Sequence, residues 1–348
     1  MRLVSILPES GEVADPTGHT VAVVLPSGGL LPLVVLARLA PDVLAEEIDG
    51  LELRRVLGLD PSGETLARAL AAADPAEVAA EAIDPATVRL AAPIPHPGKI
   101  VGVGHNYLEH VREQGLDKPD RPVFFSKFAN AVVADGAPIR RPAGTHALDF
   151  EAELAVVVGR TARHVSPAEG LGCVAGFTCA NDVTARDWQG QAAALGPGEK
   201  GDGQWLRAKG SDTFLPLGPT LATPAELDRI AGADRDGSGL AVRSWLTKAS
   251  GPTAGQEVQM QDGNTSDLLF GVGELISLIS AEITLDPGDV VITGTPSGVG
   301  VFRTPPVFLE PGDVVRVEVA GLGSLTNPIC DQAGLAPSGS PAAKLLGR

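Results

Sequence analysis

Two glutamates in one short apolar segment are the clearest sign of chemistry in this sequence. The segment Asp149–Gly159 reads DFEAELAVVVG, and successive side chains of a β-strand point to opposite faces. Glu151 and Glu153 are therefore expected on one face, with Ala152 and Leu154 on the other. Neighbouring carboxylates repel each other, and a hard divalent cation relieves that repulsion. Oxygen ligands suit Mg²⁺, Mn²⁺ or Ca²⁺ better than Zn²⁺. The alternative is a solvated strand end.

The segment Asn181–Gln189 offers a third carboxylate. It reads NDVTARDWQ and follows an apolar run at 176–180. Asp182 is a candidate to complete a three-carboxylate set with the two glutamates. Arg186 has the two-pronged guanidinium that binds a substrate carboxylate. The competing interpretation is a surface turn stabilised by an Asp–Arg pair.

A histidine and a glutamate stand three residues apart in the segment 104–115. On a helical turn, His110 and Glu113 would be neighbours. A carboxylate beside an imidazole orients it and raises its basicity, as a water-activating general base requires. A polar surface helix is the alternative. The remaining histidines have no such company and are interpreted as structural or exposed: His19, His96, His105, His146 and His164.

The composition excludes several classes of protein. The chain has 348 residues, and 27 Lys and Arg against 43 Asp and Glu give a net charge of −16. So acidic a protein lacks the basic field that attracts nucleic acid or an anionic membrane. Cys173, Cys179 and Cys330 form no C-x-x-C pair, which argues against a disulfide framework or a structural zinc site.

Several familiar motifs are missing. The Gly-rich segments 102–104 and 293–300 lack the rest of a dinucleotide fingerprint or a P-loop, and no G-x-S-x-G elbow occurs. No apolar run has the length of a transmembrane helix, and the first ten residues lack a signal-peptide core. The expectation is a soluble cytoplasmic protein with reduced thiols.

The chain is expected to contain two domains and a tail. Residues 1–95 predict a small N-terminal α+β accessory domain, with β-like runs at 21–25 and 30–36 and a helix over 64–73 capped near Ser62. The proline-rich segment 91–98 marks the boundary. Residues 96–330 form the catalytic domain. The Ala-, Gly-, Ser- and Pro-rich residues 331–348 predict a loosely held tail.

From residue 99 onward, the pattern is mainly β with a few short helices. A turn that leads into a strand occurs twice, as LDPGDVV at 285–291 and LEPGDVV at 309–315, and Pro-Gly suits a type II turn. The expected strands are 99–104, 122–127, 153–159, 176–180, 290–294 and 314–319. The expected helices are 107–114, 166–172 and 271–279.

Together, these segments resemble the fumarylacetoacetate hydrolase superfamily from about residue 99 to residue 328. The resemblance rests on collinear motifs: GHNYLEH at 104–110, PVFFSK at 122–127, DFEAEL at 149–154, NDVTARD at 181–187, KGSDTF at 209–214, DGNTS at 262–266 and TGTPSGVG at 293–300. It implies a mixed β-sandwich roll that usually dimerises, with the N-terminal domain of longer members.

The resemblance also implies the roles of particular residues. It implies one Mg²⁺ or Mn²⁺ ion on Glu151, Glu153 and Asp182, and a His110–Glu113 dyad on a lid. Lys209 is implied to be catalytic. Substrate contacts are implied for Arg186, Gln189, Thr295 and Tyr107. His105 stands where Arg or Leu is more usual, at the rim of the pocket.

The predicted activity is metal-dependent hydrolysis of a C–C bond in a 1,3-diketo acid such as an acylpyruvate. The cation would stabilise enolate charge, the dyad would deprotonate the attacking water, and Lys209 would stabilise the oxyanion. The alternatives are decarboxylation of a β-keto acid such as oxaloacetate, or hydration or isomerisation of unsaturated 2-oxo acids. A non-catalytic, metal-stabilised dimeric scaffold is a further alternative. The expected partners are a small 2-oxo acid and a second copy of the chain.

Overall fold

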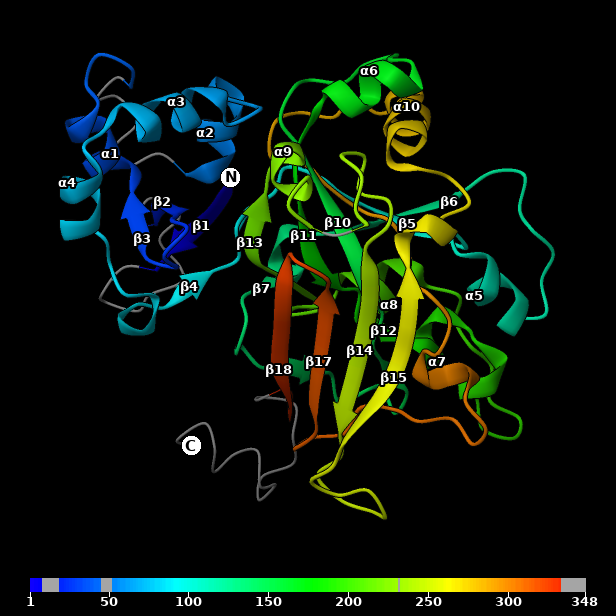
Figure 1. Cartoon of the computed structure of the whole chain (residues 1–348). Helices are drawn as coiled ribbons and strands as arrows, with labels where there is room; N and C mark the ends of the chain where they lie inside the picture. The colour runs from blue at the N-terminus through cyan, green and yellow to red at the C-terminus, as the bar shows by residue number, and fades with distance from the viewer. Residues whose placement is uncertain (8–18, 45–51, 231, 333–348) are drawn as a thin grey trace.

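A large mixed sheet forms the centre of the molecule (Figure 1). The computed structural model describes residues 1–7, 19–44, 52–230 and 232–332. The central strands β10 and β11 are buried along their whole length, because layers cover both faces of the sheet. The strand order is β3 (Leu30–Pro32), β2 (Thr20–Val24), β1 (Arg2–Ile6), β13 (Leu215–Ala222), β11 (Val174–Asn181), β10 (Ala152–Val158), β16 (Val290–Ile292), β5 (Ile100–Gly104) and β6 (Val123–Lys127), with β4 (Leu90–Ala91) on β1 and β7 (Val132–Val133) on β13.

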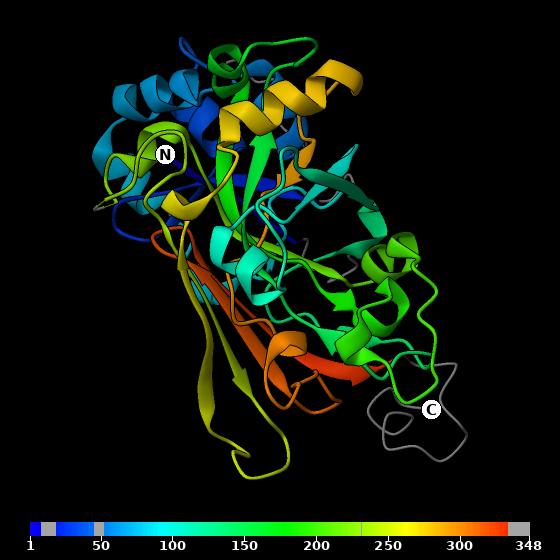
Figure 2. The same ribbon diagram turned by 90° about the vertical axis from the view of Figure 1, so that its right-hand side faces the viewer.

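A second sheet packs against β10 and β11 (Figures 1 and 2). Its strands β14 and β17 alternate buried and partly exposed residues, as expected when one face meets the core. The predicted β-sandwich is therefore confirmed. The order of this sheet is β15 (Glu257–Asn264), β14 (Ala241–Thr247), β17 (Val314–Val319), β18 (Gly323–Asp331) and β8 (Ile139–Arg141), and a separate pair joins β12 (Thr184–Ala185) to β9 (Leu148–Asp149).

The helices are short and lie around the sheets. α10 packs against α6 at one end of the main sheet (Figure 2). No helix in the described part of the chain combines the length and apolar character that crossing a bilayer requires. The helices are α1 (Leu33–Leu39), α2 (Leu53–Leu59), α3 (Glu64–Ala72), α4 (Pro75–Ala80), α5 (Leu108–Glu113), α6 (Pro167–Gly172), α7 (Arg186–Gln189), α8 (Trp205–Gly210), α9 (Pro224–Leu227) and α10 (Val272–Glu282).

The N-terminal segment is joined to the rest through the main sheet. β1 pairs with β13, with Arg2 opposite Ala222 and Leu3 opposite Leu221. The helices α1 and α4 lie on the side of this extension that faces away from the rest of the molecule (Figure 1). The domain boundary near residue 95 stays a prediction, and residues 333–348 of the predicted tail lie outside the described residues.

Two local predictions in the N-terminal segment are wrong. The run 30–36 is a strand only as far as Pro32, where α1 begins, because proline has no N–H to continue the ladder. The helix over 64–73 exists as α3, but Ser62 does not cap it. Gly63 is the N-cap, at φ 71°, and the Leu66 N–H donates to Asp60 Oδ2 at 3.0 Å.

The repeated turn is confirmed in both copies. Gly288 and Gly312 have φ values of 84° and 96°, which a type II turn requires at its third residue. The N–H of the following aspartate closes each turn at 3.0 Å, from Asp289 to Asp286 and from Asp313 to Glu310. The first copy is followed by β16, and β16 is followed by the loop 293–300, which lies beside the candidate site.

Candidate active site

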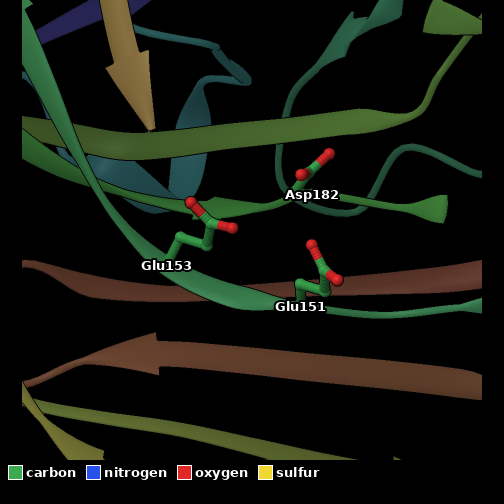
Figure 3. A group of neighbouring side chains, drawn as sticks. All are labelled: Glu151, Glu153 and Asp182. Atoms are coloured by element: carbon green, nitrogen blue, oxygen red, sulfur yellow. The ribbon is translucent and has the colours of Figure 1, made fainter. Parts of the chain in front are cut away.

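β10 and β11 bring the three predicted carboxylates together (Figure 3). The strands are antiparallel neighbours, with Ala152 opposite Asn181. The Asp182 N–H donates to the Glu151 carbonyl at 2.9 Å. One oxygen of each of Glu151, Glu153 and Asp182 lies within 4.8 Å of the others, and all three side chains are buried. The predicted convergence is confirmed.

Two buried lysines neutralise part of this negative charge. Lys209 Nζ lies 2.6 Å from Glu151 Oε2 and 2.5 Å from Asp182 Oδ2. Lys127 Nζ lies 2.5 Å from Asp182 Oδ1. Burial lowers the pKa of Lys127 to about 8. Burial also favours a lower pKa for Lys209. The negative charges of Asp182 and Glu151 have the larger effect, so the pKa of Lys209 is raised.

Glu153 is the least compensated of the three carboxylates. Burial raises its pKa well above the ordinary value, and the charges of Asp182 and Glu151 add to this effect. The Gly294 N–H donates to Glu153 Oε2 at 2.7 Å, but no Lys or Arg in the described part of the chain forms an ion pair with it. Glu151 differs, because Lys209 and Arg186 overcome the effect of burial and lower its pKa. A cation among the three carboxylates would supply the missing positive charge.

Arg186 is predicted to hold a substrate carboxylate, but its guanidinium is engaged by protein groups. Nε donates to Asp149 Oδ2 at 2.9 Å, Nη2 to Glu151 Oε1 at 2.7 Å, and Nη1 to Gln189 Oε1 at 3.1 Å. Arg186 is also only 2% exposed. In this geometry Arg186 orients Glu151, and Gln189 in turn holds Arg186. Both residues also line the pocket beside the carboxylates, so their contact with a substrate stays a prediction.

Replacing Arg186 by lysine is expected to lower the affinity for Mn²⁺ by about 10–100-fold, the range typical of residues that orient metal ligands. Lysine keeps the positive charge but lacks the forked guanidinium group, which donates to Asp149 and Glu151 at the same time. Titration calorimetry with Mn²⁺ measures the change. The exposed Arg207→Lys is the matched control, and an Arg186→Lys affinity equal to that of the control would contradict the orienting role.

The predicted His110–Glu113 pair is present on α5. His110 Nδ1 lies 2.6 Å from Glu113 Oε1. The Gly298 N–H donates to Glu113 Oε2 at 3.1 Å, so the loop 293–300 holds the carboxylate from its other side. The His110 ring is buried and meets Phe302 edge-on, with 5.9 Å between ring centroids. The imidazole is thus held in one orientation beside the carboxylate cluster.

Two of the carboxylates and the histidine of the pair line one small pocket. Glu151, Glu153 and His110 contribute to its wall together with the aromatic rings of Phe125 and Trp205, whose centroids lie 5.6 Å apart. The space open to the centres of water molecules is about 30 Å³, which corresponds to roughly two such molecules. The pocket therefore suits a small acid.

Sequence reasoning missed several groups of this pocket. From the residue pattern alone, His105 is interpreted as structural or exposed, whereas the resemblance puts it at the rim of the pocket; it is half-buried and lines the pocket. It adopts φ 56°, and burial together with His110 lowers its pKa. The signal available was its place in the GHNY segment. Gln114 and Gln191 also line the pocket, and Lys127 lies in a motif that the resemblance used without giving it a role.

The other two predicted substrate contacts differ in their position. Thr295 lies on the pocket wall, where its contact with a substrate stays a prediction, and Tyr107 does not lie there. Thr295 lines the pocket, but its hydroxyl donates to the Ala152 carbonyl at 2.9 Å and accepts from Gln261 Nε2 at 2.6 Å. Tyr107 is 1% exposed and is not part of the pocket wall. Its hydroxyl has no hydrogen-bond partner among the described residues. Thr295 therefore supports β10 near the carboxylates, and Tyr107 packs in the core.

The fold and the site define an enzyme with a centre suited to a divalent cation. Residues 99–330 match the family model described as fumarylacetoacetate (FAA) hydrolase, C-terminal. The chain belongs to the fumarylacetoacetate hydrolase family.

Relatives within this family carry out several reactions. The chain is 42% identical over 242 residues to the oxaloacetate tautomerase fahd2, mitochondrial, of Xenopus laevis, covering 70% of this chain and 68% of that protein. A fumarylacetoacetate hydrolase structure from Exiguobacterium antarcticum matches with a TM-score of 0.69 and 28% identity, covering 95% of this chain and 100% of that chain. A 5-carboxymethyl-2-hydroxymuconate delta-isomerase structure from Mycobacterium smegmatis matches with a TM-score of 0.62 and 31% identity, covering 96% of this chain and 100% of that chain.

Proposed function

We propose that the protein interconverts the keto and enol forms of an oxaloacetate-like 2-oxo acid, with Mg²⁺ or Mn²⁺ on Glu151, Glu153 and Asp182. The observation that carries this proposal is a small pocket lined by Glu151, Glu153 and His110, where the two glutamates belong to a buried three-carboxylate cluster and the histidine is paired with Glu113. The relative named oxaloacetate tautomerase favours this alternative over the C–C hydrolase reaction expected from the motifs.

The residues of the site fit a hard divalent cation. All three donors are carboxylates, they are buried, and Glu153 has no ion-pair partner among the described residues. Mg²⁺ and Mn²⁺ prefer such oxygen ligands, and Ca²⁺ accepts them too. When bound, the cation polarises the 2-oxo group and stabilises the negative charge of the enolate.

The chain's own residues would move the proton. Starting from the keto form, His110 takes a proton from the carbon next to the 2-oxo group. A proton is then delivered to the oxygen of the 2-oxo group, which gives the enol. Glu113 holds Nδ1 of His110 at 2.6 Å and stabilises the imidazolium. Lys209, at 2.5 to 2.6 Å from two of the carboxylates, supplies positive charge beside the growing negative charge. Phe125 and Trp205 restrict the access of water.

Assays on three reactions test the proposal. The ultraviolet absorbance of enol-oxaloacetate follows tautomerisation, release of CO₂ follows decarboxylation, and release of pyruvate from acetylpyruvate follows C–C hydrolysis. We expect tautomerisation to be the fastest reaction and to stop when a chelator removes the metal. Rapid acetylpyruvate cleavage without tautomerisation would overturn the proposal in favour of the hydrolase.

Hydrolysis is the second candidate because the His110–Glu113 hydrogen bond would serve equally to activate a water molecule. The two reactions differ in whether that water can reach the substrate beside Phe125 and Trp205.

Localisation and assembly stay predictions. The Xenopus relative is mitochondrial by name, which gives the cytoplasmic prediction no support. The homodimer rests on the resemblance alone.

A further inference from the structure

A second and much larger cavity lies between the N-terminal segment and the catalytic part. Its volume is about 840 Å³, within the range of roughly 300–1,000 Å³ that is typical of ligand pockets. Residues 89–92 around β4 form one wall, and residues 132–138 around β7 form another. None of its described lining residues belongs to the active-site pocket.

The wall of this cavity is largely apolar. Leu7, Leu90 and Ala91 contribute from the N-terminal side, and Val132 and Val133 from the other. Ligand pockets combine such apolar walls with a few polar groups that fix orientation. The apolar part of a ligand would therefore find a matching surface here.

Two arginines supply the polar groups. Arg89 and Arg140 line the cavity, and both are exposed. Neither guanidinium forms an ion pair or a side-chain hydrogen bond with any residue that the structure describes. Asp135 also lines the cavity, but its Oδ1 accepts the Thr326 N–H at 2.7 Å.

Two histidines also line the cavity. His19 and His96 line the same cavity, with their rings stacked at a centroid distance of 6.5 Å. The cavity thus carries two permanent positive charges against one negative charge, in a chain with a net charge of −16. An anion would be attracted here in spite of the acidic surroundings.

Hydrogen bonds hold the wall around residues 134–140 in place. Asn327 Nδ2 donates to the carbonyls of Ala134 at 3.0 Å and Ala137 at 2.8 Å. The Arg140 N–H donates to Thr213 Oγ1 at 2.8 Å. The backbone that carries Arg140 is therefore fixed, and a ligand would meet a cavity that is already formed.

We propose that this cavity binds an organic carboxylate with an apolar body, of the size of a medium-chain fatty acid. The guanidinium forks of Arg89 and Arg140 pair with the carboxylate, and the walls around β4 and β7 cover the hydrocarbon. A small 2-oxo acid has no apolar body to fill such a volume. The proposal is independent of the reaction at the carboxylate site.

Titration calorimetry with octanoate tests the binding, in the presence of Mg²⁺ and saturating oxalate so that the carboxylate site does not contribute. We expect octanoate to bind at a single site. 1-Octanol should bind at least about tenfold more weakly, because it cannot form the charged hydrogen bonds of a carboxylate. Acetate should also bind at least about tenfold more weakly, because it has no hydrocarbon to bury against the apolar walls. Octanol binding as tightly as octanoate, or no octanoate binding at millimolar concentration, would overturn the proposal.

The double variant Arg89→Gln/Arg140→Gln locates the site. Both side chains are exposed, so the fold should be kept, which circular dichroism checks. We expect the octanoate affinity to fall at least about tenfold, whereas Arg55→Gln, at an exposed position on α2, should leave it unchanged. An unchanged affinity in the double variant would place the carboxylate elsewhere and refute this site.

Discussion

Glu153→Gln is expected to abolish tight Mn²⁺ binding and to lower turnover by about 10³-fold, equivalent to about 4 kcal/mol of transition-state stabilisation. Glutamine keeps the shape of the side chain but removes the charge that a cation would meet. Calorimetry with Mn²⁺ and the tautomerase assay measure the two effects. Glu274→Gln, at an exposed position on α10, is the control. A Glu153→Gln variant that binds Mn²⁺ like the wild type would remove Glu153 from the metal site.

In the metal-free protein, Glu153→Gln is expected to be favourable and to raise the thermal stability. The raised pKa of Glu153 means that the folded state keeps a proton that the unfolded state releases. Metal-free wild type therefore loses stability as the pH rises above the unfolded-state pKa of a glutamate, at about 4.3. Glutamine has no such proton, so Glu153→Gln should exceed the wild type in Tm at about pH 8, and the advantage should shrink towards about pH 4. Thermal unfolding in a chelator across this range tests the sign.

The parts of the site that sequence reasoning found are those set by local geometry. Strand alternation placed Glu151 and Glu153 on one face, and helical spacing placed His110 beside Glu113. Both relations hold in the structure because each depends on a single element. The third carboxylate, Asp182, lies beside the other two because it follows β11, which pairs with β10, and its role as a metal ligand stays a prediction.

The parts that it missed depend on contacts between distant segments. Lys127 reaches Asp182 across 55 residues, and no local pattern indicates that a lysine at the end of an apolar strand turns inward. The ion pairs of Arg186 with Asp149 and Glu151 also join positions that are 37 and 35 residues apart, so no local pattern indicates them. Its predicted contact with a substrate stays a prediction. Tyr107 is buried for the same reason, since its neighbour across the bridge, Leu268, is far away in the chain.

The fold shows the same division. Most strands and helices expected from residue 99 onward are present with small shifts at their ends, including β17 over Val314–Val319. The pairing of β1 with β13 was not expected, because the boundary near residue 95 was drawn from composition. The prolines indicate that the connector is stiff. They do not indicate whether the strands before and after the connector belong to the same sheet.

His110→Asn is expected to lower kcat by about 10²–10⁴-fold, the range for loss of a general base, while Mn²⁺ affinity stays unchanged. Asparagine cannot accept the proton, but the carboxylate cluster keeps its partners because His110 is not among the three proposed ligands. Metal titration and steady-state kinetics on the same preparation separate the two effects. A parallel loss of metal affinity would instead assign His110 to the metal site.

A second variant separates the proton acceptor from the group that supports it. Glu113→Gln keeps the imidazole and removes only its carboxylate partner at 2.6 Å, so it should lose less activity than His110→Asn. His164→Asn, at an exposed position, controls for removal of a histidine. If His110→Asn kept the wild-type turnover, the base would be another group of the pocket, and His105 lines the same pocket.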